Sequence, residues 1–225
     1  MKNFVAGLAV ATLVSLSSGA AFAATIIDGT TQGLYNSGIG DLNVGSAPFP
    51  CPNVGCGDPN VDYGPGDAAL INGIVNTSAA LGNWLTTPTT PGGTWSGGPV
   101  NIPSTWSINS ETAIIYAIDA GATGLSNVIA SFGVDNGLFV WLNGVFQGGH
   151  LRSGGVAANE FVLNLGSLGV GMNYLQVLRE DHGGSTGYSV LVTGDVSAVP
   201  LPAAGWLMLA GIGGLAALRR RRKAA

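Results

Sequence analysis

Gly137–Phe146 reads GLFVWLNGVF, and this stretch decides which class of fold the chain adopts. Five apolar residues, Leu138 to Leu142, precede Asn143-Gly144, and apolar residues resume directly after that pair. A two-residue type I′ turn needs positive φ at both central positions, which Asn and Gly accept readily. The stretch therefore predicts a β-hairpin with Asn143-Gly144 at its tip.

Short apolar runs of the same kind recur along the second half of the chain, each ended by turn residues. They are TAIIYAID (112–119), SNVIASFGV (126–134), GLFVWL (137–142), VFQGG (145–149), EFVLNL (160–165), NYLQVLRE (173–180) and GYSVLVTG (187–194). Seven runs at this spacing are typical of an antiparallel β-sandwich or barrel. We therefore expect an all-β, antiparallel, jelly-roll-like β-sandwich with its core in residues 102–198. Within EFVLNL, Phe161, Leu163 and Leu165 share one face and are expected to point into that core.

Residues 24–101 carry Gly, Pro, Asn or Asp every few positions, which indicates loops and short strands. Only Asp67–Trp84 permits a helix, and Gly73 with two Asn residues weakens it. We expect a loop-heavy N-terminal part of the exported domain. Further on, Asp135 and Asn136 in GVDNG fit either oxygen ligands of a cation or an Asx-turn between two strands.

Residues 1–23 have the pattern of a secretory signal peptide. Lys2 supplies the positive charge and Phe4–Leu16 the apolar region, and Ala21-Phe22-Ala23 offers the small residues that signal peptidase reads. Cleavage is expected between Ala23 and Ala24. The chain is therefore expected to be exported.

The charges of the chain are unevenly distributed. Of the eight Lys and Arg residues, only Arg152 and Arg179 lie between residues 24 and 198, which contain all twelve Asp and Glu residues and so carry a formal charge of −10. A domain this acidic repels phosphate backbones, which argues against nucleic acid as a partner. Divalent cations, or simply solubility in salty surroundings, fit better.

The segment DPNVDYG (58–64) has the alternating oxygen ligands of a calcium loop. Asp58, Asn60 and Asp62 lie two residues apart, and Asp67 follows. The EF-hand pattern then fails, because Tyr63 stands where Gly is needed and Ala69 where a bidentate Glu should be. Asp58, Asn60, Asp62 and Asp67 are therefore a candidate site for structural calcium, and no other cofactor is expected.

The two cysteines, Cys51 and Cys56, enclose the short loop CPNVGC. Outside the cytoplasm, an even number of closely spaced cysteines favours a disulfide, and a metal site would need more ligands than this pair offers. We expect Cys51 and Cys56 to be joined.

The C-terminal residues 199–225 combine three features. A Pro-framed motif, an uncharged apolar stretch and a basic tail follow one another as Val199-Pro200-Leu201-Pro202-Ala203, Ala204–Leu218, and Arg219, Arg220, Arg221, Arg222 and Lys223. The apolar stretch is marginal in length for a transmembrane helix, which needs about 20 residues. The basic tail places the C-terminus in the cytoplasm and the acidic domain outside.

These three features together resemble the PEP-CTERM sorting signal of Gram-negative bacteria, in its VPLPA variant. The resemblance implies that an exosortase, a membrane cysteine protease, recognises the motif and cleaves near it. It also implies an association with exopolysaccharide and delivery from the inner membrane to the cell surface or the biofilm matrix. The alternative is a plain C-terminal anchor.

The body of the chain has a resemblance of its own. Gly133–Phe146 and Gly171–Gly194, with the phrases FGVDNG, WLNG and LREDHGG, resemble galactose-binding-like jelly-roll modules and a group of exported PEP-CTERM proteins. The resemblance covers roughly residues 106–194. It implies a β-sandwich and brings no assigned activity.

The sequence lacks the usual motifs of catalysis. There is no G-x-S-x-G elbow and no H-E-x-x-H, and only His150 and His182 are present. In REDHGG (179–184), Glu180 and His182 could act as an acid–base pair or as metal ligands. Alternatively, Asp181 and His182 could bond backbone groups of a Gly183-Gly184 turn. A Glu111/Glu180 glycosidase pair is the other catalytic alternative. We expect a protein without enzymatic activity.

Three tryptophans lie in loops rich in Gly, Pro and Thr. Trp84, Trp95 and Trp106 could stack on sugar rings or serve as packing anchors, whereas Trp141 lies in a strand and is expected in the core. The sequence thus predicts an exported structural or binding protein of the cell surface or matrix. The alternatives are a lectin-like sugar-binding module and a carbohydrate-active enzyme using Glu180 or Asp181.

Overall fold

The computed structural model describes residues 22–42, 60–196 and 211–213. The described residues between 22 and 196 belong to one compact unit. Its elements are β1 (Phe22–Ile27), β2 (Leu34–Gly40), β3 (Val61–Tyr63), the 3₁₀ turn η1 (Pro65–Asp67), α1 (Ala68–Val75), β4 (Glu111–Asp119), β5 (Leu125–Leu142), β6 (Val145–Arg152), β7 (Phe161–Leu168), β8 (Met172–Glu180) and β9 (Gly187–Val196). The unit is therefore mostly β, as the sequence predicts.

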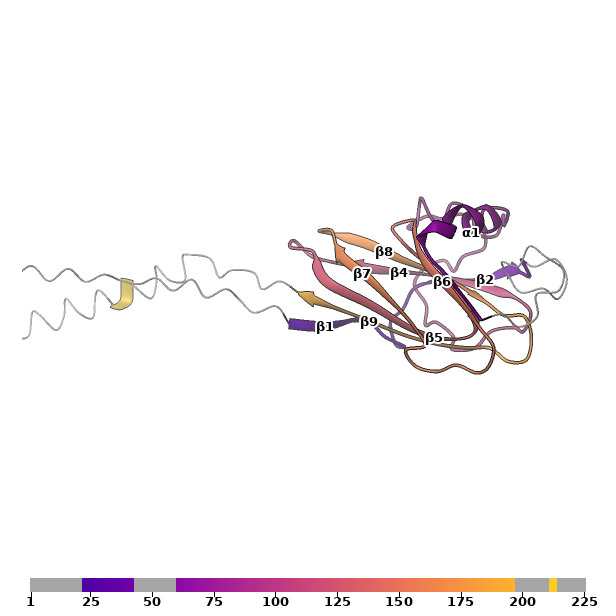
Figure 1. Cartoon of the computed structure of the whole chain (residues 1–225). Coiled ribbons are helices and arrows are strands. Elements are labelled where there is room, and N and C mark those ends of the chain that lie inside the picture. The colour runs from indigo at the N-terminus through magenta and orange to yellow at the C-terminus, as the bar shows by residue number, and fades with distance from the viewer. Residues whose placement is uncertain (1–21, 43–59, 197–210, 214–225) are drawn as a thin grey trace, which may run out of the picture. The chain divides into compact units, whose positions relative to one another are not determined.

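All strand pairs between the named strands are antiparallel, and four of the eight include the long strand β5 (Figure 1). Its first half pairs with β9 and β7, and its second half pairs with β8 and β6. The strand order runs β1-β9-β5-β8-β4-β2, with β3 joined to β6. The result is a curled antiparallel sheet whose two halves face each other across a common core.

The continuity of β5 corrects one prediction. The runs 126–134 and 137–142 are not separated by a turn at Asp135-Asn136, because both belong to one strand of 18 residues. Gly133 and Gly137 flank the point where β5 changes partners, and a Cβ at either position would overlap Ala157 or Leu151. Glycine at both positions lets other segments of the same chain pack directly against the backbone of β5.

Two predictions about local strand geometry are confirmed. Asn143 and Gly144 form the tip of the β5–β6 hairpin, with φ of 50° and 79°. On β7, Leu165 is buried and Phe161 and Leu163 pack against the core, while Val162 is exposed.

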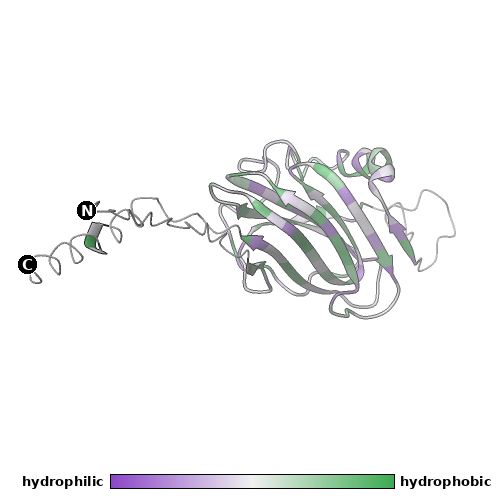
Figure 2. Ribbon diagram, turned by 60° about the vertical axis from the view of Figure 1, so that its left-hand side comes forward, coloured by the Kyte–Doolittle hydropathy of each residue, from purple (hydrophilic) through white to green (hydrophobic). Residues whose placement is uncertain are grey.

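Apolar side chains form two clusters, one on each face of the half-sheet that contains β4, β8 and the end of β5. The cluster between the two halves includes Ile114, Tyr116, Phe132, Leu138, Val140, Val177 and Val192. The second cluster includes Ile71 and Val75 of α1 with Trp84, Phe139, Trp141 and Leu178. Figure 2 shows hydrophobic residues recurring along the central strands. The half-sheet is thus buried on both faces, which explains its nearly unbroken apolar runs.

The N-terminal part of the chain belongs to the same sheet. β1 pairs with β9, β2 with β4 and β3 with β6. The helix in the segment 67–84 covers only Ala68–Val75 and is followed by turns, because residues with low helix propensity, Asn72, Gly73 and Asn76, lie at its end.

Several predictions fall on or beyond the edges of the described residues. Ala23 and Ala24 lie in β1, opposite Asp195 and Gly194 of β9. The Cys51–Cys56 disulfide, Asp58 and the motif Val199–Ala203 with its basic tail lie outside the described residues. Among the residues that are described, no helix is long and apolar enough to span a membrane.

Leu178 tests the second cluster, because it is fully buried on β8. Leu178→Ala should lower the free energy of unfolding by about 2–5 kcal/mol, since the truncation loses burial and leaves a cavity. Val162→Ala is the control and should change that free energy by less than about 0.5 kcal/mol, because Val162 is exposed on β7. Urea unfolding followed by tryptophan fluorescence measures both; equal losses would place Leu178 outside the core.

Candidate functional site

Three tryptophans form a continuous stack from the second core cluster to the surface. The ring of Trp141 on β5 meets Trp84 edge-on, with centroids 5.2 Å apart, and Trp84 stacks on Trp95 at 5.8 Å. Trp141 and Trp84 are buried, and Trp95 is half-buried. The Nε1–H groups of Trp141 and Trp95 donate to Asn72 Oδ1 at 2.7 Å and to the Leu81 carbonyl at 3.0 Å. The indole of Trp95 is therefore held in one orientation.

Trp95 lines an open pocket of about 440 Å³. The rest of the lining is Leu34 of β2 and the loop residues Thr89, Thr90, Pro91, Gly92, Gly93, Ser96 and Gly97. No side chain in this lining is ionisable. The pocket therefore offers one aromatic ring, aliphatic groups, hydroxyls and glycine backbone.

The loop that carries the pocket is fixed on both sides. The amide of Thr94 donates to the Ala80 carbonyl at 2.9 Å, and the amide of Ser96 donates to the Tyr35 carbonyl at 2.8 Å. Buried Asn36 ties the two sides together, since its Nδ2 donates to the Ala80 carbonyl and its Oδ1 accepts from Thr94 Oγ1. These bonds preorganise the pocket, which reduces the entropy lost when a ligand binds.

The other two loop tryptophans are packing anchors. Trp84 is 1% exposed and lies inside the stack. Trp106 donates its Nε1–H to the Ser110 carbonyl at 2.8 Å and places its ring 4.3 Å from the guanidinium of Arg179. Of the three tryptophans considered for sugar stacking, only Trp95 lines the pocket. No periodicity in the sequence separates it from the other two.

The structure brings Glu111 and Glu180 together, although they are 69 residues apart in sequence. Thr112 of β4 lies opposite Arg179 of β8, next to Glu111 and Glu180 in the two strands, and the charge of Glu180 acts on Glu111. Burial raises the pKa of Glu111 to about 8, with help from the charges of Glu180 and Asp41 and against the Leu42 amide that donates to it. Both glutamates are fully buried, and neither lines the pocket.

The residues of REDHGG are divided between two environments. His182 Nδ1 lies 3.1 Å from Glu180 Oε1, so these two are paired as their spacing allows. Asp181 accepts from the amides of Asn109 and Gly183, at 2.6 and 3.2 Å, which confirms its role in the turn. Burial raises the pKa of Asp181, although these two amides oppose the shift.

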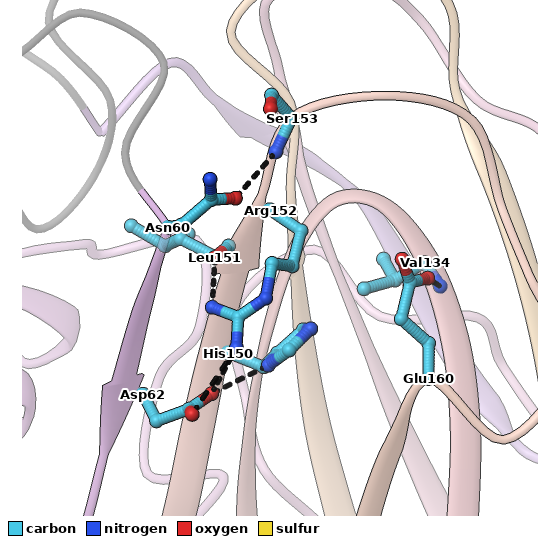
Figure 3. Close-up of polar contacts among 8 residues, drawn as sticks. All are labelled: Asn60, Asp62, Val134, His150, Leu151, Arg152, Ser153 and Glu160. Carbon is cyan, nitrogen blue, oxygen red and sulfur yellow. Dashed lines mark hydrogen bonds and ion pairs between the residues drawn. The ribbon is translucent and has the colours of Figure 1, made fainter.

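The candidate calcium residues are occupied by other contacts where the structure describes them. Asp62 lies between His150 Nδ1, at 2.6 Å, and the guanidinium of Arg152, at 3.2 Å (Figure 3). Asp67 accepts from the Gly64 amide, and Asn60 Oδ1 accepts from the Ser153 amide. Within residues 22–42, 60–196 and 211–213, no group of three or more His, Cys, Asp or Glu residues is placed to hold a metal ion. A calcium site that includes Asp58 stays a prediction.

Comparison with known proteins adds little to these observations. No protein family and no curated protein matches the sequence. Among solved structures, the chain is similar to a PA14 sugar-binding domain from an RTX adhesin, at 13% identity and a TM-score of 0.33, over 73% of this chain and 90% of that one. A likeness at this level establishes neither the fold nor a function of this chain.

The raised pKa of Glu111 predicts a pH dependence of stability. Between pH 4.5, the ordinary pKa of a glutamate, and about 8, the folded protein keeps a proton on Glu111 that the unfolded chain releases. The stability from this group is complete below pH 4.5 and is lost as the pH rises toward 8, by roughly 1.4 kcal/mol per pH unit. Glu111→Gln, which stays neutral, should lose less free energy of unfolding between about pH 5 and pH 8 than the wild type. Equal losses in the two proteins would assign the dependence to another group.

Proposed function

We propose that the chain is an exported, non-enzymatic carbohydrate-binding protein that holds saccharide in the pocket at Trp95. The observation that carries this proposal is the half-buried indole of Trp95, held in one orientation at the wall of an open, uncharged pocket. A pyranose ring has an apolar face of C–H groups and a rim of hydroxyls. The pocket offers the Trp95 ring for the former and hydroxyl and backbone groups for the latter.

The size and rigidity of the pocket support the same function. Small-molecule sites typically have volumes of about 300–1,000 Å³, and the pocket has about 440 Å³. The tryptophan stack and the bonds through Asn36 hold the loop before a ligand arrives. Weak individual contacts suffice for binding when the loop loses little conformational entropy.

A binding role is favoured over catalysis by the placement of the carboxylates. Hydrolysis of a glycosidic bond needs two carboxyl groups on either side of the bond. The pocket lining contains none, and Glu111 and Glu180 are fully buried. Turnover of a polysaccharide by the purified protein, abolished by Glu180→Gln, would replace this proposal with the enzymatic one.

The route of the protein to its site of action is proposed from the sequence of its two ends. The signal peptide directs export, the stretch 204–218 halts the chain in the inner membrane, and Arg219 to Lys223 hold the tail in the cytoplasm. The motif Val199–Ala203, with its prolines at positions 200 and 202, is the segment that an exosortase-like protease would recognise. The released protein would then reach the cell surface or the matrix and bind exopolysaccharide there.

This route predicts the mass of the mature protein. Mass spectrometry of protein from the surface fraction of its native host should find a mature chain that begins at Ala24 and ends near Ala203. A surface protein that still carries the C-terminal peptide containing Trp206 would show that the tail is only an anchor.

The binding function is tested with Trp95. Trp95→Ala should weaken binding of a polysaccharide ligand about tenfold, because it removes the aromatic ring on which the apolar face of a sugar would pack, and aromatic contacts contribute roughly 0.5–1.5 kcal/mol beyond the area that they bury. Affinity electrophoresis in gels that contain dextran, β-glucan or pullulan measures the effect on mobility. Val162→Ala is the matched control, since Val162 is exposed on β7 and does not line the pocket. If no polysaccharide retards the wild-type protein, or if Trp95→Ala is retarded equally, the proposal is wrong.

A further inference from the structure

We infer that the pocket at Trp95 selects uncharged saccharides and rejects anionic ones such as uronates and sulfated sugars. This inference rests on the proposed function and names the class of ligand. It depends on where the few cationic groups of the domain lie. Proteins recognise carboxylate and sulfate groups mainly through Arg and Lys, with which these groups form charge-assisted hydrogen bonds.

The two arginines of the domain are both engaged elsewhere. Arg179 is fully buried, where Trp106 and Tyr188 lie 4.3 and 4.9 Å from its guanidinium. Its N–H groups donate to Thr112 Oγ1, the Pro103 carbonyl and the Tyr35 hydroxyl. Arg152 pairs with Asp62 at the β3–β6 edge (Figure 3). Neither arginine is a lining residue of the pocket.

The two histidines are engaged as well. His150 is buried and bonds to Asp62, and His182 pairs with Glu180. Residues 24–198 contain no lysine. An anionic sugar in the pocket would therefore lose hydration of its charge without gaining a cationic partner from this part of the chain.

The charge of the whole domain acts in the same direction. Twelve Asp and Glu residues against two arginines give residues 24–198 a formal charge of −10. A polysaccharide with a charge on every unit meets this repulsion repeatedly along its length, and salt screens it over about 8 Å at physiological ionic strength. A neutral polymer meets none of it. The contacts of such a polymer with the Trp95 ring and with the hydroxyl groups of the pocket do not depend on the salt concentration.

Matched pairs of polymers test this selectivity. The probes are dextran and β-glucan with their carboxymethylated forms, so that each pair shares one backbone. At low salt, the neutral polymer should bind at least tenfold more tightly than its anionic form, and the difference should narrow at high salt. The affinity for the neutral polymer should stay constant.

Two substitutions separate a local effect from the net charge. Thr90→Lys places a cation in the lining and should restore binding of the carboxymethylated polymer several-fold, with little change for the neutral one. Thr25→Lys adds the same charge at an exposed position of β1. Because β1 and β2 lie at opposite ends of the strand order, this substitution should restore less binding of the carboxymethylated polymer than Thr90→Lys does.

The outcomes distinguish this inference from the function on which it rests. If the anionic polymers bind as tightly as the neutral ones, and Trp95→Ala abolishes both, the inference is wrong and the binding function stands. The inference is equally wrong if anionic binding requires added calcium and then matches neutral binding. If no polymer of either kind binds, the proposed function itself is overturned.

Discussion

The structure depends on the passage of β5 from one half of the sheet to the other. Because its first half pairs with β9 and β7 and its second half with β8 and β6, one strand fixes the registers of both layers. The two glycines at the crossing, Gly133 and Gly137, let other chain segments pack against the backbone there. The layers then close over a single apolar core, while the far side of the second layer receives α1 and the tryptophan stack.

The scarcity of cationic residues shapes the rest of the chemistry. Arg179 has no acidic hydrogen-bond partner among those described; its charge is met by aromatic faces and neutral oxygens between the layers. Arg152 holds the short strand β3 to β6 through Asp62. Neither arginine lines the pocket at Trp95, and the residues that line it are all uncharged.

The fold, and not sequence spacing, determines what surrounds the acidic residues. Glu111 and Glu180 lie at adjoining ends of the paired strands β4 and β8, and the burial of Glu111 raises its pKa to about 8. Spacing alone also suggested that Asp62 and Asp67 are calcium ligands. In the fold, Asp62 faces His150 and Arg152, because β3 adds to the edge of β6, and Asp67 bonds the backbone of its own turn.

The sequence by itself determined the features that depend on neighbouring residues. The two-residue period of β7 and the Asn143-Gly144 hairpin follow from side-chain alternation and turn geometry, and the uneven charge follows from composition. The tertiary structure decided what depends on distant segments. It merged two apolar runs into β5, set Glu111 against Glu180, and left Trp95 at the surface while burying Trp84. Strand register and burial arise from packing between parts of the chain that are far apart in sequence. Local periodicity therefore cannot predict them.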